Sequence, residues 1–421
     1  MPVEKLNNIL TSALETLKEK GTAKGKEMVI TGVKPAEGEK GPRYYIEGKE
    51  KQEFIKMNAN SYLGMSFRRE IIEAEEEFAK KYGAGPGAVR FISGTYKPHV
   101  DLEKKLAEFH KREAAMIFSS AYTTTMGVLT PLITDETIVI SDELNHNCII
   151  NAIRLSRPKI KEIYKHLDMQ ALEEKVKNNI GKGNRVIIVT DGIFSMRGDY
   201  APLDVISNIS KKYDGEFEEG IITVVDDSHG IGAFGKTGRG TEEYTNADGV
   251  DILIATLGKA LGINGGYVTA ASTIINYLRE TAPFYIYSNP ITPSEAGAAM
   301  KALEILNSNE GLKLLEYLHK LTKRFEKGLI NLEYEIIESD HPIVPLMIRD
   351  TKKTSELVQY LTDHGVLATG LNYPVVPKGD EEIRFQISAD HTEYDIDLSL
   401  IHISEPTRPL YTSYAVFCLK K

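Results

Sequence analysis

The sequence predicts an α/β protein with a mostly parallel sheet in a large domain and a smaller α+β domain toward the C-terminus. From about residue 58, short apolar runs rich in β-branched residues alternate with amphipathic segments of helical spacing. Continuous apolar runs indicate strands buried on both faces, as in a parallel sheet covered by helices. The 421 residues are also enough for two large domains.

The elements of the large domain follow one another in a regular order. Apolar runs predict strands at 114–118, 137–141, 185–190, 222–227 and 252–257. Amphipathic spacing predicts helices at 99–110, 122–132, 147–155, 168–178 and 202–212. We therefore assign residues 58–300 to this domain.

Residues 1–57 are predicted to form an N-terminal helix and short strands that pack near the small domain. The helix has apolar residues at helical intervals among charges, which distinguishes it from a signal peptide. A Lys-, Gly-, Pro- and Glu-rich connector covers 21–42. Two strand-like runs follow, at 43–47 and 53–57.

The small domain is predicted to span residues 301–398. Its expected elements are a long helical stretch over 293–331, strands at 334–337, 342–348 and 382–388, and a helix over 353–364. Thr392 is expected to cap a last helix that is lost after about residue 398, because prolines follow at 406 and 409. We expect residues 399–421 to be a non-native tail that contributes nothing to the site.

Composition excludes several classes of protein. Acidic residues outnumber basic ones, 60 to 51, so the chain lacks the positive charge that nucleic acids or anionic membranes attract. The two cysteines, Cys148 and Cys418, have no paired spacing, which excludes a disulfide framework and a cysteine-rich zinc site. No apolar run approaches the roughly 20 residues that cross a bilayer. We expect a soluble, cytoplasmic protein without a metal, a nucleic-acid partner or a membrane partner.

Polar residues stand directly after several of the predicted strands. Ligands of open α/β sheets bind beyond the carboxyl ends of the strands, so these residues are the first candidates for a site. Lys259 follows one strand among small residues, and Asp226 ends another. Most lysines in turns are solvated, and an aspartate there is often a cap. In a dry pocket, however, a lysine amine forms a Schiff base with carbonyls, and a carboxylate needs a cationic partner such as a protonated pyridine nitrogen.

Taken together, the strand ends resemble one family, the α-oxoamine synthases. These are pyridoxal 5'-phosphate (PLP) enzymes of fold type I, the aspartate-aminotransferase fold. The resemblance runs from about residue 4 to about residue 398, and eight motifs carry it in the family's order. They are 60–64, 90–95, 144–146, 194–196, 226–230, 238–240, 256–262 and 374–377.

The resemblance implies a role for each cofactor-binding residue. Lys259 would bind PLP as a Schiff base and later move the substrate proton, while Asp226 would pair with the pyridine nitrogen. His146 would stack on the ring, although it could also be only a helix cap. His229 and Ser195 would contact the region of the phenolic oxygen. The catalytic set is then Lys259, His146, Asp226 and His229.

The resemblance also implies a phosphate site and a shared dimer. Thr256 and the backbone amides of Ala121 and Tyr122, at the start of a helix, would hold the phosphate, because free amides there suit an anion. Ser288 resembles a phosphate contact supplied by the neighbouring subunit. The protein would therefore be a homodimer with a shared active site.

Substrate recognition follows from the same resemblance. Asn60 and Arg384 would bind the carboxylate of the amino acid, for which the planar fork of an arginine is suited. The implied reaction condenses glycine, or a similar small amino acid, with an acyl-CoA and releases CoA. Arg197, where the family usually has Asp, could alter substrate access but not the cofactor chemistry.

Three stretches of the sequence bear on which branch of the family the protein belongs to. The stretches 89–95, 240–244 and 373–379 are most similar to the glycine C-acetyltransferases (2-amino-3-ketobutyrate CoA ligases), which favours acetyl-CoA. An 8-amino-7-oxononanoate synthase and a long-chain acyltransferase remain alternatives. Outside this class stand a PLP aminotransferase and a non-catalytic partner subunit, and the presence of Lys259 argues against the latter.

Overall fold

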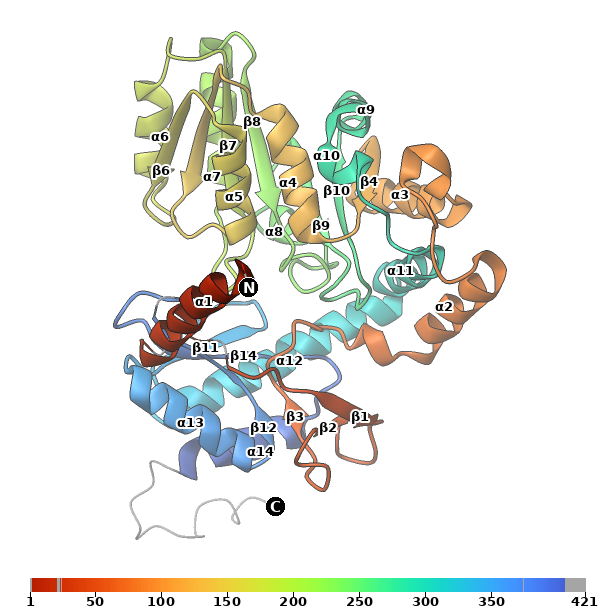
Figure 1. Ribbon diagram of the computed structural model, residues 1–421, viewed down its shortest axis with the longest axis vertical. Coiled ribbons are helices and arrows are strands. Elements are labelled where there is room, and N and C mark those ends of the chain that lie inside the picture. Colours follow the sequence, from red (N-terminus) through yellow and green to blue (C-terminus); the bar gives the residue numbers. More distant parts are fainter. Residues whose placement is uncertain (1, 21–22, 24, 374, 406–421) are drawn as a thin grey trace.

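The computed structural model describes residues 2–20, 23, 25–373 and 375–405, arranged as a large sheet-containing part and a smaller part joined by a long helix (Figure 1). The large sheet has seven strands in the order β4-β10-β9-β8-β7-β5-β6. Only β10 runs antiparallel to its neighbours, so the predicted, mostly parallel sheet is confirmed. Its strands are β4 (Ala114–Phe118), β5 (Thr137–Asp142), β6 (Ile160–Tyr164), β7 (Arg185–Asp191), β8 (Ile221–Asp226), β9 (Ile252–Thr256) and β10 (Gly266–Ala270).

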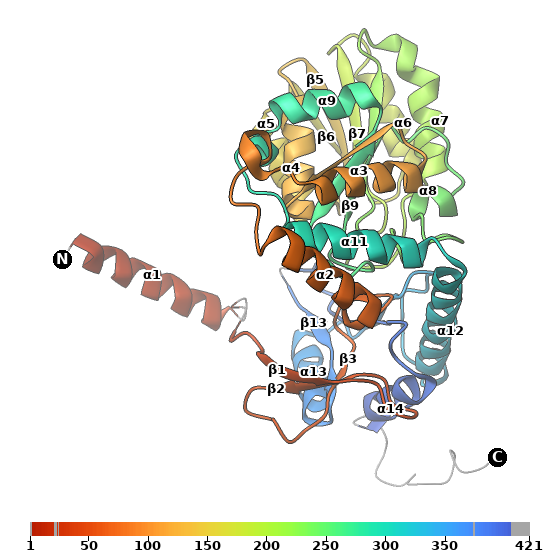
Figure 2. The ribbon, with the colours of Figure 1, turned by 90° about the vertical axis from the view of Figure 1, so that its right-hand side faces the viewer.

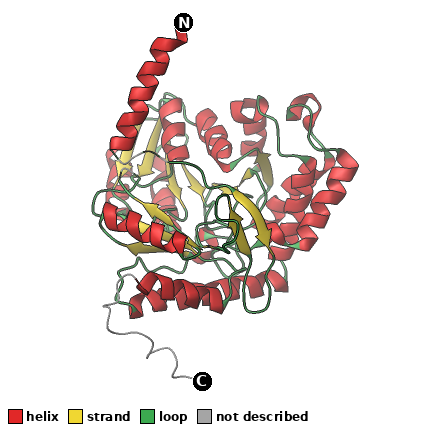
Figure 3. Ribbon diagram, turned by 60° about the horizontal axis from the view of Figure 1, so that its bottom comes forward, coloured by secondary structure: helices red, strands yellow, loops and turns green. Residues whose placement is uncertain are grey.

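Helices enclose the large sheet, as Figure 3 shows. The central strand β7 illustrates why: Val186 and Ile188 join one buried cluster, and Ile187 and Val189 join the other. A strand that buries both faces needs cover on both. The helices of this part are α2 (Arg69–Tyr82), α3 (Lys97–His110), α4 (Ala121–Leu132), α5 (Asn147–Ser156), α6 (Met169–Asn178), α7 (Leu203–Tyr213), α8 (Thr241–Tyr244), α9 (Ser272–Thr281), α10 (Pro283–Ile286) and α11 (Pro293–Leu306).

The predicted helical stretch over 293–331 is two helices rather than one. α11 ends at Leu306, and α12 (Asn309–Asn331) begins after Ser308, whose side chain accepts hydrogen bonds from the amides of Glu310 and Gly311. Gly311 packs so closely on the end of α11 that a Cβ would lie 2.2 Å from the Leu306 carbonyl oxygen. α12 then runs from the large part into the small one (Figure 2).

The small part is built on an antiparallel sheet in the order β11-β14-β13. The run at 334–337, predicted as a strand, contributes only an isolated bridge between Ile336 and Leu346. Three elements follow the prediction closely: β11 (Ile343–Met347), α13 (Thr351–Asp363) and β14 (Glu382–Gln386). The short strands β12 (Val366–Leu367) and β13 (Thr369–Leu371) are not among the predicted elements.

The N-terminal strands join the small part, but the N-terminal helix does not. β3 (Ile55–Lys56) pairs in parallel with β12, and β2 (Arg43–Ile46) pairs with β1 (Ile30–Lys34), which lies inside the expected connector. α1 (Pro2–Glu19), expected to pack near the small domain, projects away from the body (Figure 2). Its apolar stripe is exposed, with Ile9 at 66%.

The last helix extends further than expected. α14 (Glu393–Ser404) begins at Thr392, whose hydroxyl accepts from the Asp395 amide as predicted. It does not end near residue 398, and Ile403 is fully buried. The first proline, Pro406, comes after these residues in the sequence, so it does not interrupt the helix up to Ser404. The rest of the expected tail lies outside the described residues. Within the described part of the chain, no helix is long and apolar enough to span a membrane.

Candidate active site

The polar residues predicted at the strand ends meet at one edge of the large sheet. β5, β7, β8 and β9 are parallel, so their carboxyl ends lie together. Asp191 ends β7 and Asp226 ends β8, and the two are direct partners in the strand register. Lys259 lies in the bend that follows β9.

Asp226 is buried and is held by hydrogen bonds to both carboxylate oxygens. Its Oδ1 accepts from the Ser228 amide at 3.2 Å, and its Oδ2 accepts from the Thr125 hydroxyl at 3.0 Å. The Cys148 thiol lies 3.7 Å from the same Oδ2. A buried carboxylate fixed in this way is suited to accept a hydrogen bond from a pyridinium nitrogen.

Lys259 carries an amine whose environment favours the neutral form. Burial lowers the pKa of Lys259 to about 8, although the carboxylates of Asp226 and Asp191 act in the opposite direction. A neutral amine is the form that attacks a carbonyl carbon. The lysine predicted from the strand-end pattern therefore lies beside the predicted aspartate in an environment that suits Schiff-base formation.

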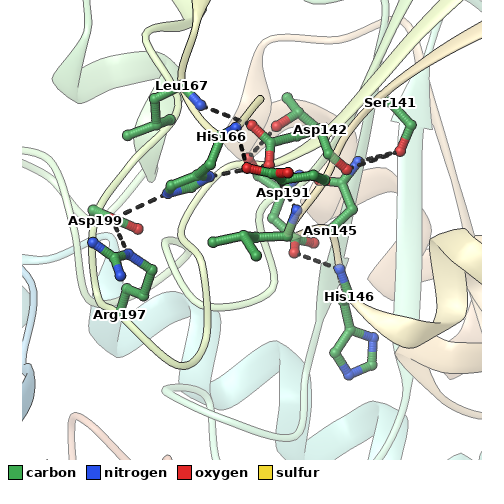
Figure 4. Close-up of polar contacts among 12 residues, drawn as sticks. Ser141, Asp142, Asn145, His146, His166, Leu167, Asp191, Arg197 and Asp199 are labelled. Atoms are coloured by element: carbon green, nitrogen blue, oxygen red, sulfur yellow. Dashed lines mark hydrogen bonds and ion pairs between the residues drawn. The ribbon is translucent and has the colours of Figure 1, made fainter. Parts of the chain in front are cut away.

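His146 both caps a helix and presents a ring at the site. Its Nδ1 accepts from the Cys148 amide at 3.2 Å, and its own amide donates to Asp191 Oδ2 at 2.8 Å. Figure 4 shows the imidazole extending away from the Asp191 carboxylate. The exposed ring is free to stack on a ligand, so the cap and the proposed stacking role are compatible.

Asp191 was not among the predicted site residues. Burial and the neighbouring Asp226 raise the pKa of Asp191 well above its usual range. Its amide donates to Asn145 Oδ1 at 2.8 Å, which ties it to the motif that precedes His146. Its position in the sequence could have identified Asp191 as a site residue, because it ends β7 just as Asp226 ends β8.

His229 belongs to a buried group of rings. Its Nδ1 lies 2.7 Å from the Tyr62 hydroxyl, and its backbone carbonyl accepts from His341 Nε2 at 2.9 Å. Burial, together with the positive charge of Lys259, lowers the pKa of His229 well below its usual value. His229 is therefore a neutral imidazole with a fixed orientation, held by two residues that lay outside the predicted site.

Arg384 lies on β14 of the small part and donates hydrogen bonds to two residues, Ser195 and Gln386. Its Nη1 donates to the Ser195 carbonyl at 2.7 Å. With the Gln386 amide oriented to donate to Met57, the Gln386 oxygen accepts from Arg384 Nε and Nη2 at 2.8 and 2.7 Å. A guanidinium has five N–H groups, so these oxygens leave one on each terminal nitrogen, a pair that matches a carboxylate. Nη1 also lies 3.9 Å from the Met196 thioether sulfur, a weak acceptor that a substrate carboxylate would replace. Asn60 Oδ1 lies 3.3 Å from the Tyr62 hydroxyl, which also contacts His229.

The residues predicted to bind the phosphate through their backbone amides, Ala121 and Tyr122, lie at the start of α4. Ser120 caps this helix by accepting from the Thr123 amide. The amides of Ala121 and Tyr122 belong to the first turn, where no helical carbonyl is available to them. Gly266 of β10 lies so close that a Cβ would be 2.5 Å from the Ala121 nitrogen.

Two further phosphate contacts stay predictions. The Thr256 hydroxyl donates to the Gly265 carbonyl at 3.1 Å and accepts from the Gly258 amide at 3.0 Å. Its proton is therefore already used in a hydrogen bond to the backbone. Ser288 follows α10 next to Tyr287, whose side chain is 80% exposed.

The residues present fit PLP. The aldehyde would meet the Lys259 amine, the pyridine nitrogen would meet the buried Asp226 carboxylate, and the phosphate would meet the open amides of α4. In the described part of the chain, no group of His, Cys, Asp and Glu side chains is arranged to hold a metal ion.

Most of the chain matches a known family. The model of the aminotransferase class I and II family matches residues 52–403. A high-resolution structure of SPT with a PLP internal aldimine has a TM-score of 0.85 and 25% identity, over 96% of this chain and 97% of that one. Fold and site thus define a PLP-dependent enzyme of fold type I.

Two curated relatives narrow the class. The chain is 40% identical to the 8-amino-7-oxononanoate synthase of Petrotoga mobilis over 375 residues, 89% of this chain and 92% of that one. It is 40% identical to the mitochondrial 2-amino-3-ketobutyrate coenzyme A ligase of Bos taurus over 394 residues, 93% and 90% of the two chains. The protein belongs to the α-oxoamine synthase family and is a PLP-dependent acyltransferase, as its eight motifs predict.

Proposed function

We propose that the protein condenses glycine with acetyl-CoA and releases CoA, as a glycine C-acetyltransferase. The observation that carries the amino-acid half of this proposal is the pair of N–H groups that Ser195 and Gln386 leave on Arg384. The charge of Arg384 is close enough to Lys259 to act on its pKa. The acetyl half rests on the resemblance of the stretches 89–95, 240–244 and 373–379 to that branch.

The residues of the site divide the chemistry between them. When bound, PLP withdraws electrons from the Cα atom of the amino acid and makes its proton acidic. Arg384 and Asn60 hold the substrate carboxylate, which orients the Cα–H bond toward the Lys259 amine. Lys259, with its lowered pKa, accepts that proton. The Cα carbon then attacks the thioester carbonyl, and the CoA thiolate leaves.

An 8-amino-7-oxononanoate synthase is the second candidate, because a relative of that name is as similar as the glycine-branch relative. The name of its product places a methyl group beside the amino carbon, so its amino acid is alanine and its acyl group has seven carbons ending in a carboxylate. Because the product has nine carbons, the carboxyl carbon of alanine leaves as CO2. The two candidates therefore differ in both substrates. A PLP aminotransferase differs from both because it needs no CoA.

One assay separates these functions. Free CoA thiol is measured with glycine or alanine, each combined with acetyl-CoA or with a seven-carbon acyl thioester. The proposal expects the highest kcat/KM with glycine and acetyl-CoA. A preference for alanine and the longer thioester establishes the second candidate instead. Amino-group transfer to an oxo acid without thiol release would place the protein among the aminotransferases.

The proposal includes a homodimer with a shared active site and a cytoplasmic location. The exposure of large apolar side chains supports the dimer. Phe91 and Ile92, in the short turn before α3, are 64% and 66% exposed, and Tyr287 beside Ser288 is 80% exposed. The apolar stripe of α1 is exposed as well. Such large apolar areas are typical of surfaces that a second copy covers.

A further inference from the structure

A histidine outside the predicted site holds the turn from Phe194 to Asp199 in place (Figure 4). His166 follows β6, and its Nδ1 lies 3.0 Å from Asp142 Oδ1 while its Nε2 lies 3.2 Å from Asp199 Oδ2. Each ring nitrogen thus faces a carboxylate oxygen. Since a carboxylate only accepts hydrogen bonds, both nitrogens must donate, and the ring must be an imidazolium.

The surroundings of His166 favour this charged form. The ring packs edge-on against Phe194, with centroids 4.4 Å apart, and its side chain is 13% exposed. Burial alone would lower the pKa of His166, but hydrogen bonds to Asp142 and Asp199 outweigh it and raise the pKa to about 9. Two other charged residues stand nearby. Glu143 accepts from the His166 amide, and Arg197 donates to Asp199 Oδ2.

Asp199 closes the turn that carries Ser195. The Phe194 amide donates to the Asp199 carbonyl at 3.0 Å, and the Gly198 amide donates to the Phe194 carbonyl at 2.8 Å. Gly198 has a φ of 74°, a conformation that favours glycine. Within this closed turn, the Ser195 carbonyl is the acceptor for Arg384 Nη1.

We infer that His166 is a positioning residue for the substrate carboxylate. The imidazolium joins the end of β5, through Asp142, to Asp199, and thereby fixes the carbonyl that orients the Arg384 fork. The inference rests on the proposed role of Arg384 in binding the amino acid. Without the bridge, the turn is held at one point fewer, and the fork presents its two N–H groups in a wider range of directions.

The kinetic test uses the variant His166→Gln. Glutamine is neutral and has a single donor nitrogen, so it cannot bridge the two carboxylates as the imidazolium does. We expect the KM for the amino acid to rise about tenfold, with kcat within about twofold and the KM for the acyl-CoA unchanged. The absorption spectrum of bound PLP should not change. His402→Gln is the matched control, because His402 is a largely buried histidine beside Glu405 on α14. An amino-acid KM equal to that of the wild type overturns the inference.

A second measurement does not depend on activity. In the 13C NMR spectrum of histidine-labelled protein, the ring signal lost in His166→Gln should titrate near pH 9 in the wild type, and titration near 6.5 overturns the bridge. A raised folded pKa stabilises the protein fully below about pH 6.5, and this contribution is lost as the pH rises through about 9. The difference in Tm between wild type and His166→Gln should therefore be largest near pH 6 and disappear near pH 10.

The outcomes separate the two proposals. A wild type that shows no amino-acid-dependent CoA release contradicts the proposed function, while the titration still decides whether the bridge exists. If His166→Gln does not fold, Asp199→Asn replaces it, because it keeps the size of the side chain and removes one of the two carboxylates. The same rise in amino-acid KM is expected for that variant. Its His166 ring signal should titrate at a lower pH than in the wild type, because one of the two carboxylates that raise the His166 pKa is removed. The absence of these two changes overturns the inference.

Discussion

The two N–H groups left on Arg384 make a quantitative prediction at the scale of a residue. In Arg384→Ala, the charged hydrogen bonds to the substrate carboxylate are lost, which costs about 1.5–3 kcal/mol, or roughly 10- to 150-fold. We expect this loss mainly in the KM for glycine, since the contact exists before and during the reaction. Arg349→Ala is the control, because Arg349 is exposed and pairs with Glu335. A glycine KM unchanged in Arg384→Ala would remove Arg384 from the carboxylate site.

Lys259 gives a prediction that needs no turnover. Borohydride reduction of the PLP-loaded protein, followed by peptide mapping, should label Lys259, and Lys259→Ala should lose the label. Reconstitution of the cofactor-free protein should become faster as the pH rises through about 8, because the neutral amine is the reactive form. The exposed Lys301 serves as the control in Lys301→Ala. Label at another lysine would contradict the assignment.

How much of the site the sequence predicts depends on the kind of signal each residue leaves. Lys259 and Asp226 directly follow apolar runs, so their placement at one sheet edge follows from the pattern alone. Tyr62 leaves no such signal, because its role depends on a contact with His229, far away in the sequence. Gln386 leaves none either, because its role depends on how its amide is oriented between Met57 and Arg384. His166 is similar, since its partners Asp142 and Asp199 come from different segments.

At the scale of elements, the start of α14 holds the N-terminal strands to the small part. Arg43 Nη2 donates to Asp395 Oδ1 at 2.5 Å, and the Gly41 amide donates to Asp395 Oδ2 at 3.0 Å. Both side chains of the ion pair are buried. A buried pair that loses one partner leaves a charge without compensation.

Asp395→Asn should therefore lower the free energy of unfolding by about 3–5 kcal/mol. Asp397→Asn is the matched control, because Asp397 lies on the same helix and pairs with Arg324 in an exposed position. That change should cost less than about 1 kcal/mol. Urea unfolding followed by circular dichroism measures both values. Equal losses in the two variants would contradict the role given to the buried pair.

Two of the features that the sequence did not predict have a local physical cause. β6 alternates partly buried and exposed residues at the edge of the sheet, so it lacks the continuous apolar run that identifies its neighbours. The break between α11 and α12 depends on Ser308 and Gly311, whose effect is local and leaves the apolar spacing on both sides intact. The spacing of apolar residues indicates well which segments are buried, but it indicates helix caps and edge strands poorly.

At the scale of the whole molecule, the exposed stripe of α1 predicts the oligomeric state. Light scattering should give about twice the 46.9 kDa of one chain. Leu10→Glu places a charge in the stripe and should raise the dissociation constant of the dimer at least tenfold, by about 1.4 kcal/mol or more. Lys5→Glu on the same helix controls for the change of charge. A wild type that is monomeric at micromolar concentration would contradict the dimer.

The pairing of the N-terminal strands with the end of the chain also dictates an order of folding. Arg43 and Asp395 are 352 positions apart, whereas β4 to β10 lie within one continuous stretch. Because synthesis runs from the N-terminus, the large sheet can assemble while β3 still lacks its partner β12 and Arg43 of β2 still lacks Asp395. We expect nascent chains halted before β12 to contain a protease-resistant large part and a protease-sensitive β3. During that interval the unpaired edge of β3 is open to pairing with other chains, so the placement of one short strand decides how long the new chain needs protection from aggregation.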